Sequence, residues 1–324
     1  MKGDFAMAGV EELKQIQASH ESELFARAGV HAVGIGYKTV AGKQTDELAI
    51  VVLVERKLSS DSIDAASLIP ASLDGVPTDV VERGPAELVA AGAISIDESE
   101  RRPLVGGCAI AANPPPPGEP TGYAGTLGGF ADWTDELGLT WPVGVSASHV
   151  LGPVDSNSKG SKVMQPPRGP QVSQVSMSVR NPDVGVDAGG FAGSVKGVAP
   201  SNTILNIGTL AGSYHLQQSD LNKQVQKSGA ASKVTTGNIS LINVTVPLEG
   251  GARYVEQIVV SGAFCEPGDS GSFVVMPSAS VAGAYSVVGV LMAQERGAGA
   301  TGGYANSIGN VEAALGLRFP ASLT

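Results

Sequence analysis

From residue 123 onward, short apolar runs alternate with clusters of Gly, Ser, Asn and Pro. This rhythm is typical of short strands joined by tight turns, as in a β-sandwich or a β-barrel. The composition agrees with it, because the chain has 43 glycines among 324 residues and charged residues make up only 16%. Many glycines and few charges favour tight turns over a helix bundle. We therefore expect a mostly β fold.

The first 80 residues carry a different pattern. Apolar residues recur at helical spacing over residues 8–28, which predicts one amphipathic helix. Later apolar runs predict a strand, a buried strand, a short helix and a third strand, at residues 30–37, 48–54, 63–69 and 76–81. A helix followed by this β-β-α-β order predicts a small α+β domain.

Three other segments predict a linker, a loop and a helix. Residues 84–103 are small, acidic and basic by turns, which predicts a linker, so we place the N-terminal domain with its linker at residues 1–100. Four consecutive prolines within residues 113–120 cannot lie inside a sheet and predict an exposed loop. Residues 310–317 predict a C-terminal helix.

Residues 264–273 (Phe-Cys-Glu-Pro-Gly-Asp-Ser-Gly-Ser-Phe) contain the candidate nucleophile, Ser270. A serine hydroxyl becomes reactive when a base takes its proton and donors stabilise the oxyanion that forms. Gly268 has no side chain, so its N–H can point where a larger residue would clash. Together with the N–H of Ser270, the N–H of Gly268 would form an oxyanion hole of two backbone donors. The alternative interpretation of these residues is a plain Gly-rich turn.

His149 is the candidate base among four histidines. An apolar run and small residues at 141–148 precede it, which predicts a strand that ends in a short turn and an imidazole held by small neighbours. A general base has to reach the serine hydroxyl and be held in one tautomer. We interpret His20 as solvated in the first helix, and His31 and His215 as ordinary strand and loop residues.

Two aspartates are candidates for the carboxylate that orients the imidazole. Asp187 follows Val-Gly-Val and precedes small residues, which suits a buried acid at the end of a strand. Asp183 follows a proline in a turn and is expected to be exposed, so we favour Asp187. The order His149, Asp187, Ser270 is that of the chymotrypsin triad.

In these motifs the chain resembles the chymotrypsin-like (trypsin-like) serine peptidases, especially their bacterial branch. The similar segments are the histidine motif at 146–150, the aspartate motif at 186–188, the streptogrisin-like serine loop at 265–271, a hairpin at 227–237, and the two strands that wall the specificity pocket at 287–291 and 302–305. The resemblance covers residues 104–317.

The resemblance implies a double β-barrel after the small α+β domain. Two antiparallel six-stranded barrels, at about residues 101–195 and 196–324, would form a peptidase domain at residues 101–324. In the cleft between them, Ser270 would attack a peptide carbonyl, His149 would carry the proton and Asp187 would stabilise the imidazolium. The implied activity is that of a serine endopeptidase that works through an acyl-enzyme, without a cofactor.

The chain departs from the family in two respects. No cysteine follows His149, so the usual disulfide beside the histidine is absent. In animal zymogens a freed N-terminal amine pairs with the aspartate before the serine, which is Asp269 here. Residues 101–107 resemble an activation site, but Pro103 disfavours cleavage after the arginine pair. We therefore expect an internal cation, not identified by the sequence, to pair with Asp269.

Two other functions stay open at this point. One is a catalytically inactive relative, a binding or regulatory protein on a protease scaffold, because a fold does not guarantee an activity. The other is an esterase-like hydrolase, which carries Gly-x-Ser-x-Gly and a histidine after the serine. Residues 266–270 (Glu-Pro-Gly-Asp-Ser) break that pattern, and no suitable histidine follows Ser270.

Charge and cysteine content restrict the partners. A net charge of −10 disfavours nucleic acids and anionic membranes. Cys108 and Cys265 allow at most one disulfide, and no His/Cys cluster predicts a metal site. With no apolar leader at the start of the chain and no long apolar run, a reduced cytoplasmic setting is the simplest interpretation.

We expect a protein or peptide substrate and, as for bacterial relatives without secretion signals, limited cleavage of a partner protein. The N-terminal domain is expected to dock a partner, shield the cleft or stabilise the barrels. Segments 263–266 and 291–303 are expected to shape the substrate pocket. Glu266, Glu295 and Arg296 lie in or beside these segments.

Overall fold

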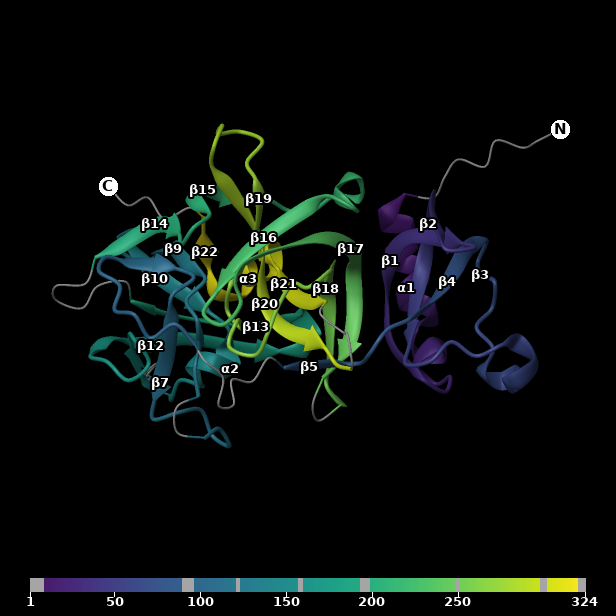
Figure 1. The fold of residues 1–324 in the computed structure, drawn as a ribbon, viewed down its shortest axis with the longest axis horizontal. Helices are drawn as coiled ribbons and strands as arrows, with labels where there is room; N and C mark the ends of the chain where they lie inside the picture. The colour runs from purple at the N-terminus through teal and green to yellow at the C-terminus, as the bar shows by residue number, and fades with distance from the viewer. Residues whose placement is uncertain are drawn as a thin grey trace.

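The computed structural model of the chain describes residues 9–88, 96–120, 123–156, 160–192, 199–248, 251–297 and 302–319. Strands dominate these residues and form two curled sheets, with a small helix-bearing unit at the N-terminal side (Figure 1). The predicted mostly β fold is confirmed. Among the described residues, no helix is long and apolar enough to cross a membrane.

The N-terminal unit is a small α+β layer. Its elements are α1 (Val10–Phe25), the antiparallel pair β1 (Val30–Val40) and β2 (Lys43–Val54), the short β3 (Ser72–Leu73), and β4 (Val76–Glu82), which runs parallel to β2. The predicted short helix at 63–69 is shorter than expected and of the 3-10 type, η2 (Ala65–Ser67), and a second 3-10 turn, η1 (Ser60–Ser62), precedes it. Serine and aspartate side chains, abundant here, compete with the backbone for hydrogen bonds and disfavour an α-helix.

The first barrel is a closed antiparallel ring. β8 (Gly125–Thr126) and β9 (Gly129–Thr134) follow one another almost end to end; β8 pairs with β7 and β9 pairs with β10, so the two share one position in the ring. The other strands are β7 (Ala109–Asn113), β10 (Thr140–Ser146), β11 (Lys162–Met164), β12 (Gln171–Asn181) and β13 (Val186–Ala192). The ring therefore has six strand positions.

The second barrel closes in the order β16, β17, β18, β21, β20, β19, again with antiparallel pairs throughout. Its strands are β16 (Gln224–Gly229), β17 (Lys233–Pro247), β18 (Arg253–Ser261), β19 (Phe273–Pro277), β20 (Tyr285–Glu295) and β21 (Gly303–Ser307). The two rings confirm the predicted pair of six-stranded barrels after an α+β unit.

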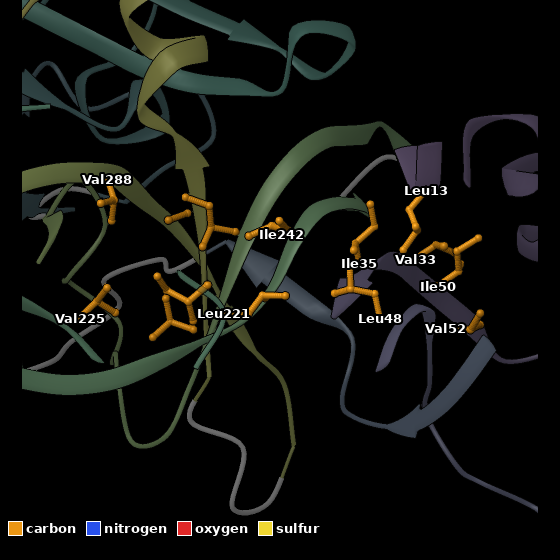
Figure 2. Close-up of a cluster of buried hydrophobic side chains, with 14 of the residues drawn as sticks. Leu13, Val33, Ile35, Leu48, Ile50, Val52, Leu221, Val225, Ile242 and Val288 are labelled. Carbon is orange, nitrogen blue, oxygen red and sulfur yellow. The ribbon is translucent and has the colours of Figure 1, made fainter. Parts of the chain in front are cut away.

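The N-terminal unit joins the second barrel through backbone pairing. β1 pairs antiparallel with β17, with Val33 opposite Thr245, so the small sheet continues into the barrel. One hydrophobic cluster contains Leu13 and Val33 of the N-terminal unit together with Val225 and Ile242 of the barrel (Figure 2). Burial of this shared apolar surface stabilises both parts.

Short elements connect the two barrels. β6 (Leu104–Gly106), β14 (Pro200–Ile204) and β15 (Gly208–Ser213) extend the sheet of the second barrel, since β15 pairs with β20. The predicted C-terminal helix forms two residues earlier than expected, as α3 (Ile308–Leu315), and leads to β22 (Leu317–Arg318), which pairs with β9 of the first barrel.

The predicted linker at 84–103 contains a strand that sequence analysis missed. β5 (Ala86–Leu88) pairs antiparallel with β20 of the second barrel. Three residues are too few to show a strand pattern in the sequence, because the two-residue period needs several repeats to be recognised.

Candidate active site

The three predicted triad residues come from three different elements. His149 lies in the one-turn helix α2 (Ser148–Leu151) directly after β10, and Asp187 is the second residue of β13. β10 and β13 are neighbours in the first barrel, with Ser146 opposite Gly189, which brings the ends that carry His149 and Asp187 together. Ser270 lies in the turn before β19 of the second barrel.

The side chains of these residues form a continuous hydrogen-bonded chain. His149 Nδ1 lies 2.7 Å from Asp187 Oδ2, and His149 Nε2 lies 2.8 Å from Ser270 Oγ. The backbone N–H of His149 also donates to Asp187 Oδ1 at 2.9 Å. Because an ionised carboxylate only accepts hydrogen bonds, Asp187 places the imidazole proton on Nδ1 and leaves Nε2 free to accept the proton of Ser270.

All three groups are shielded from water. The exposed fraction is 4% for His149 and 0% for both Asp187 and Ser270. Burial by itself would raise the pKa of Asp187, but the charge and hydrogen bonds of His149 and the charge of Arg180 hold that pKa below its ordinary value. Asp187 therefore stays ionised and can stabilise an imidazolium.

Asn306 in β21 clamps the backbone of Asp187 from the second barrel. Its Oδ1 accepts from the N–H of Asp187 at 3.0 Å, and its Nδ2 donates to the carbonyl of Asp187 at 3.0 Å and to that of Val290 at 3.3 Å. Asn306 is completely buried. Sequence analysis missed this residue; the available signal was an amide in an apolar strand, where a buried polar group needs partners.

The turn that carries Ser270 depends on two glycines with left-handed backbone. Gly268 has a φ of 101° and Gly271 a φ of 92°. A Cβ on Gly271 would lie 2.1 Å from Ser146 Oγ and 2.4 Å from the carbonyl oxygen of Thr126, so only glycine fits there. The structure thus holds this turn tightly against the first barrel.

Thr126 connects the first barrel to the serine turn at two points. Its N–H donates to the carbonyl of Ser270 at 2.8 Å, and its Oγ1 donates to the carbonyl of Gly268 at 2.9 Å. These bonds fix the backbone on both sides of Asp269 across the boundary between the barrels. Sequence analysis did not single out Thr126, because nothing local distinguishes it from other strand threonines.

Lys227 is the internal cation that pairs with Asp269. Its Nζ lies 2.6 Å from Asp269 Oδ2, and both side chains are completely buried. The carboxylate also accepts the backbone N–H groups of Glu266, Ala231 and Ser232, at 3.0–3.1 Å, and the hydroxyl of Ser232 at 2.6 Å. The predicted internal pairing is found, and it fixes the residue next to Ser270.

The remaining candidates have other surroundings. Asp183 is exposed in η3 (Pro182–Val184), and its backbone N–H donates to Asn181. His20 pairs with Asp74 at 2.9 Å, so it is held by an acid and is not simply solvated as expected. His31 bonds to the carbonyl of Arg83, and His215 pairs with Glu312, which agrees with ordinary structural roles.

Neither cysteine offers an alternative nucleophile. Cys108 and Cys265 are buried free thiols, and burial raises the pKa of each thiol to about 12. A thiol with such a pKa is almost entirely protonated at neutral pH and reacts slowly. Within the described ranges, no three His, Cys, Asp or Glu side chains gather in a way that could hold a metal ion.

A cavity of about 360 Å³ lies beside the imidazole. His149 lines it together with Pro116 of the proline-rich loop, Val154, and the charged side chains of Glu119 and Arg180. The cavity leaves room for part of a ligand next to the base.

Comparison with known proteins gives partial matches. Residues 7–81 match the family model for the NARROW LEAF 1 N-terminal domain. No curated protein matches the chain. The protease NAPase of Nocardiopsis is 23% identical, with a TM-score of 0.48, and the match covers 66% of this chain and 97% of that one.

Two further solved structures match at a similar level. Protease A of Thermobifida fusca has 20% identity and a TM-score of 0.47, over 66% of this chain and 97% of its own. The chymotrypsin of Cellulomonas bogoriensis has 20% identity and a TM-score of 0.47, over 68% and 99%. Because all three TM-scores are below 0.5, we infer the fold from the strand pairing of this chain and no activity from these matches.

Proposed function

We propose that the chain is a serine endopeptidase with His149, Asp187 and Ser270 as its catalytic triad. The observation that carries this proposal is the chain of hydrogen bonds from Asp187 through the imidazole to Ser270 Oγ, at 2.7 and 2.8 Å. A buried serine, base and carboxylate in this geometry match the roles that acyl transfer requires.

The distances support a specific division of roles. Ser270 Oγ attacks the carbonyl carbon of the scissile bond while His149 Nε2 takes the hydroxyl proton. The bond to the leaving amine then breaks, His149 returns the proton to the amine, and an acyl-enzyme remains on Ser270. Water removes the acyl group by the same steps. Asp187 stays ionised throughout and stabilises the imidazolium.

The backbone N–H groups of Gly268 and Ser270 are the proposed oxyanion hole. The left-handed φ of Gly268 supports this role, because it orients a peptide unit in a way that side chains disfavour. The buried pair of Lys227 and Asp269 holds the residue between these two donors. Donors fixed before the reaction stabilise a developing negative charge without reorganisation, which is worth about 3–4 kcal/mol per donor.

The proposed substrate is a protein or peptide, and limited cleavage of a partner protein is the proposed role. Two buried free thiols are compatible with a reducing compartment, so we also propose a cytoplasmic location. Recovery of the protein mainly from the medium of its source cells would contradict that location.

Labelling with a fluorophosphonate probe tests the nucleophile. The folded wild type is expected to be labelled, Ser270→Ala to lose all labelling, and the control Ser280→Ala, at an exposed loop serine, to keep it. Labelling that persists in Ser270→Ala would refute Ser270 as the nucleophile. A folded wild type that is never labelled would favour a binding or regulatory protein on the same fold.

A further inference from the structure

After Leu291, one edge of β20 is no longer covered by β19. This edge starts beside the hydroxyl of Ser270. On one side, β20 pairs with β21 as far as Gln294 opposite Gly303. On the other side, β19 and the serine turn cover β20 only up to Leu291, whose N–H donates to Ser272 O at 2.9 Å. Ser270 Oγ lies 3.4 Å from the carbonyl oxygen of the next residue, Met292.

The chain's own β5 covers this edge. β5 is antiparallel to β20, with Leu88 opposite Ala293, Glu87 opposite Gln294 and Ala86 opposite Glu295. β5 therefore runs along β20 toward Met292 and Ser270. A peptide that bound here in the same direction would bring its following residues toward the nucleophile.

Gln294 of β20 and Arg296, which directly follows this strand, contact Glu87, the acidic residue of β5. Gln294 Nε2 donates to Glu87 Oε1 at 2.8 Å, and Arg296 Nε lies 3.5 Å from Glu87 Oε2. The other face of β5 is apolar, because Ala86 and Leu88 pack against a hydrophobic cluster that includes Met292 and Ala293. The edge thus presents an amide and a guanidinium to a carboxylate, a pairing that favours acids over bases.

The two residues directly before β5 also make close contacts with Glu295 and Arg296. The N–H of Arg296 donates to Pro85 O at 2.8 Å, and the N–H of Gly84 donates to Glu295 Oε1 at 3.1 Å. A Cβ on Gly84 would lie 1.6 Å from the carbonyl oxygen of Arg296, so only glycine can stand at this position. Just before it, the N–H of Arg83 donates to Val54 O of the N-terminal unit.

We propose that the β20 edge at Ala293–Glu295 binds an extended peptide with an acidic residue at the position of Glu87, and that Ala86–Leu88 occupies this site as an internal competitor. This inference rests on the proposed peptidase function for its consequence in turnover, but the binding site does not require it. The N-terminal unit delivers the competitor to the edge at a high effective concentration, because Val54 anchors the chain directly before it.

Two matched glycine substitutions test the occupancy. Gly84→Ala places a methyl group against Arg296 and should release β5, whereas a Cβ on Gly9 meets no atom within 4 Å, so Gly9→Ala is the control. Binding is measured in the Ser270→Ala full-length protein, by fluorescence anisotropy of a fluorescein-labelled peptide with the sequence of residues 84–88. We expect Gly84→Ala to lower the Kd at least about tenfold relative to Gly9→Ala, as for removal of a tethered competitor.

The same assay tests the acidic preference. The peptide that carries Glu87→Lys should bind the Gly84→Ala protein about two- to fivefold more weakly, because Arg296, which is 70% exposed, then faces a like charge. Equal affinity for both peptides would overturn the acidic preference. Equal affinity of the Gly84→Ala and Gly9→Ala proteins for the original peptide would overturn the occupancy.

The substitution Glu87→Lys in the protein is a second test of the internal competitor. Unlike Gly84→Ala, it places no added atom against the backbone of Arg296. With Ser270 restored, it should raise kcat/KM for a quenched peptide library while leaving the rate of fluorophosphonate labelling unchanged, because that small probe does not need the β20 edge. Unchanged kcat/KM with normal labelling would contradict the internal competitor. A wild type that is never labelled would instead reject the peptidase proposal. The peptide affinities measured by anisotropy would still test the binding site.

Discussion

Replacement of Lys227 by methionine is the substitution whose effect on the free energy of unfolding the structure defines best. Lys227 Nζ lies 2.6 Å from Asp269 Oδ2, and neither side chain is exposed to solvent. Methionine keeps most of the volume and removes the charge, so the carboxylate loses its counter-ion. It retains four donors, from Glu266, Ala231 and Ser232, which stabilise the negative charge only in part.

Breaking a buried ion pair by removal of one partner typically costs about 3–5 kcal/mol. At about 1.4 kcal/mol per factor of ten, Lys227→Met should lower the folding equilibrium constant by roughly two to three and a half orders of magnitude. Because Asp269 directly precedes Ser270, the variant should also lose fluorophosphonate labelling. The free energy of unfolding is measured in guanidinium chloride by tryptophan fluorescence.

The matched control is Lys14→Met, which removes an ion pair of similar length on the surface. Lys14 Nζ lies 2.8 Å from Glu11 Oε1, and the two side chains are 39% and 82% exposed. Such a pair contributes about 0.5 kcal/mol or less. If Lys227→Met lowers the free energy of unfolding by no more than this control and keeps full labelling, the pair does not hold the serine turn.

Four further predictions concern Asp187, Asn306 and the N-terminal unit. Asp187→Asn should lower turnover about 10⁴-fold, because an amide favours the wrong imidazole tautomer; unchanged turnover would remove Asp187 from the triad. The pKa of Asp187 is lowered by folding, so its contribution to stability should be complete above about pH 4 and be lost as the pH falls further, which urea unfolding of wild type and Asp187→Asn can follow. Asn306→Ala should destabilise the protein by about 2–3 kcal/mol, because it leaves backbone groups of Asp187 and Val290 buried without their partner. Deletion of residues 1–82 should give an aggregating protein, because it uncovers β17 and the shared cluster; a soluble, fully active truncation would contradict this.

Local sequence was enough to find the residues with distinctive chemistry. Ser270 lies in a glycine-rich turn, His149 follows a strand that ends in small residues, and Asp187 stands between Val-Gly-Val and small residues. Asp187 was expected at the end of a strand, whereas it is the second residue of β13. Each of these cues lies within ten residues of its side chain. The strand-and-turn rhythm likewise indicated a mostly β fold, because a strand pattern depends on a few consecutive residues. The pair of barrels was implied only by the resemblance to a known family.

The contacts that hold the site together could not be predicted from local sequence patterns. Asn306 reaches Asp187 across 119 residues, and Lys227 reaches Asp269 across 42. Nothing in the sequence near Thr126 reveals that it bonds to the serine turn. Such pairings follow from barrel closure and strand register, which depend on tertiary packing and are not encoded in any single segment.

The same limit explains why β5 was not predicted. Small and charged residues are typical of linkers, and this segment becomes a strand only because the exposed edge of β20 offers it backbone partners. The junction of β1 with β17 is a second case, because each strand by itself is compatible with a separate domain.

Rapid mixing with a small p-nitrophenyl ester tests the central claim most directly, because such an ester reaches the serine without the β20 edge. We expect a burst of about one p-nitrophenol per protein as the acyl group transfers to Ser270, followed by slower steady release. Ser270→Ala and His149→Ala should both lose the burst while they remain folded. A burst of full amplitude in folded Ser270→Ala, or no burst in the wild type, would contradict the proposed acyl-enzyme mechanism.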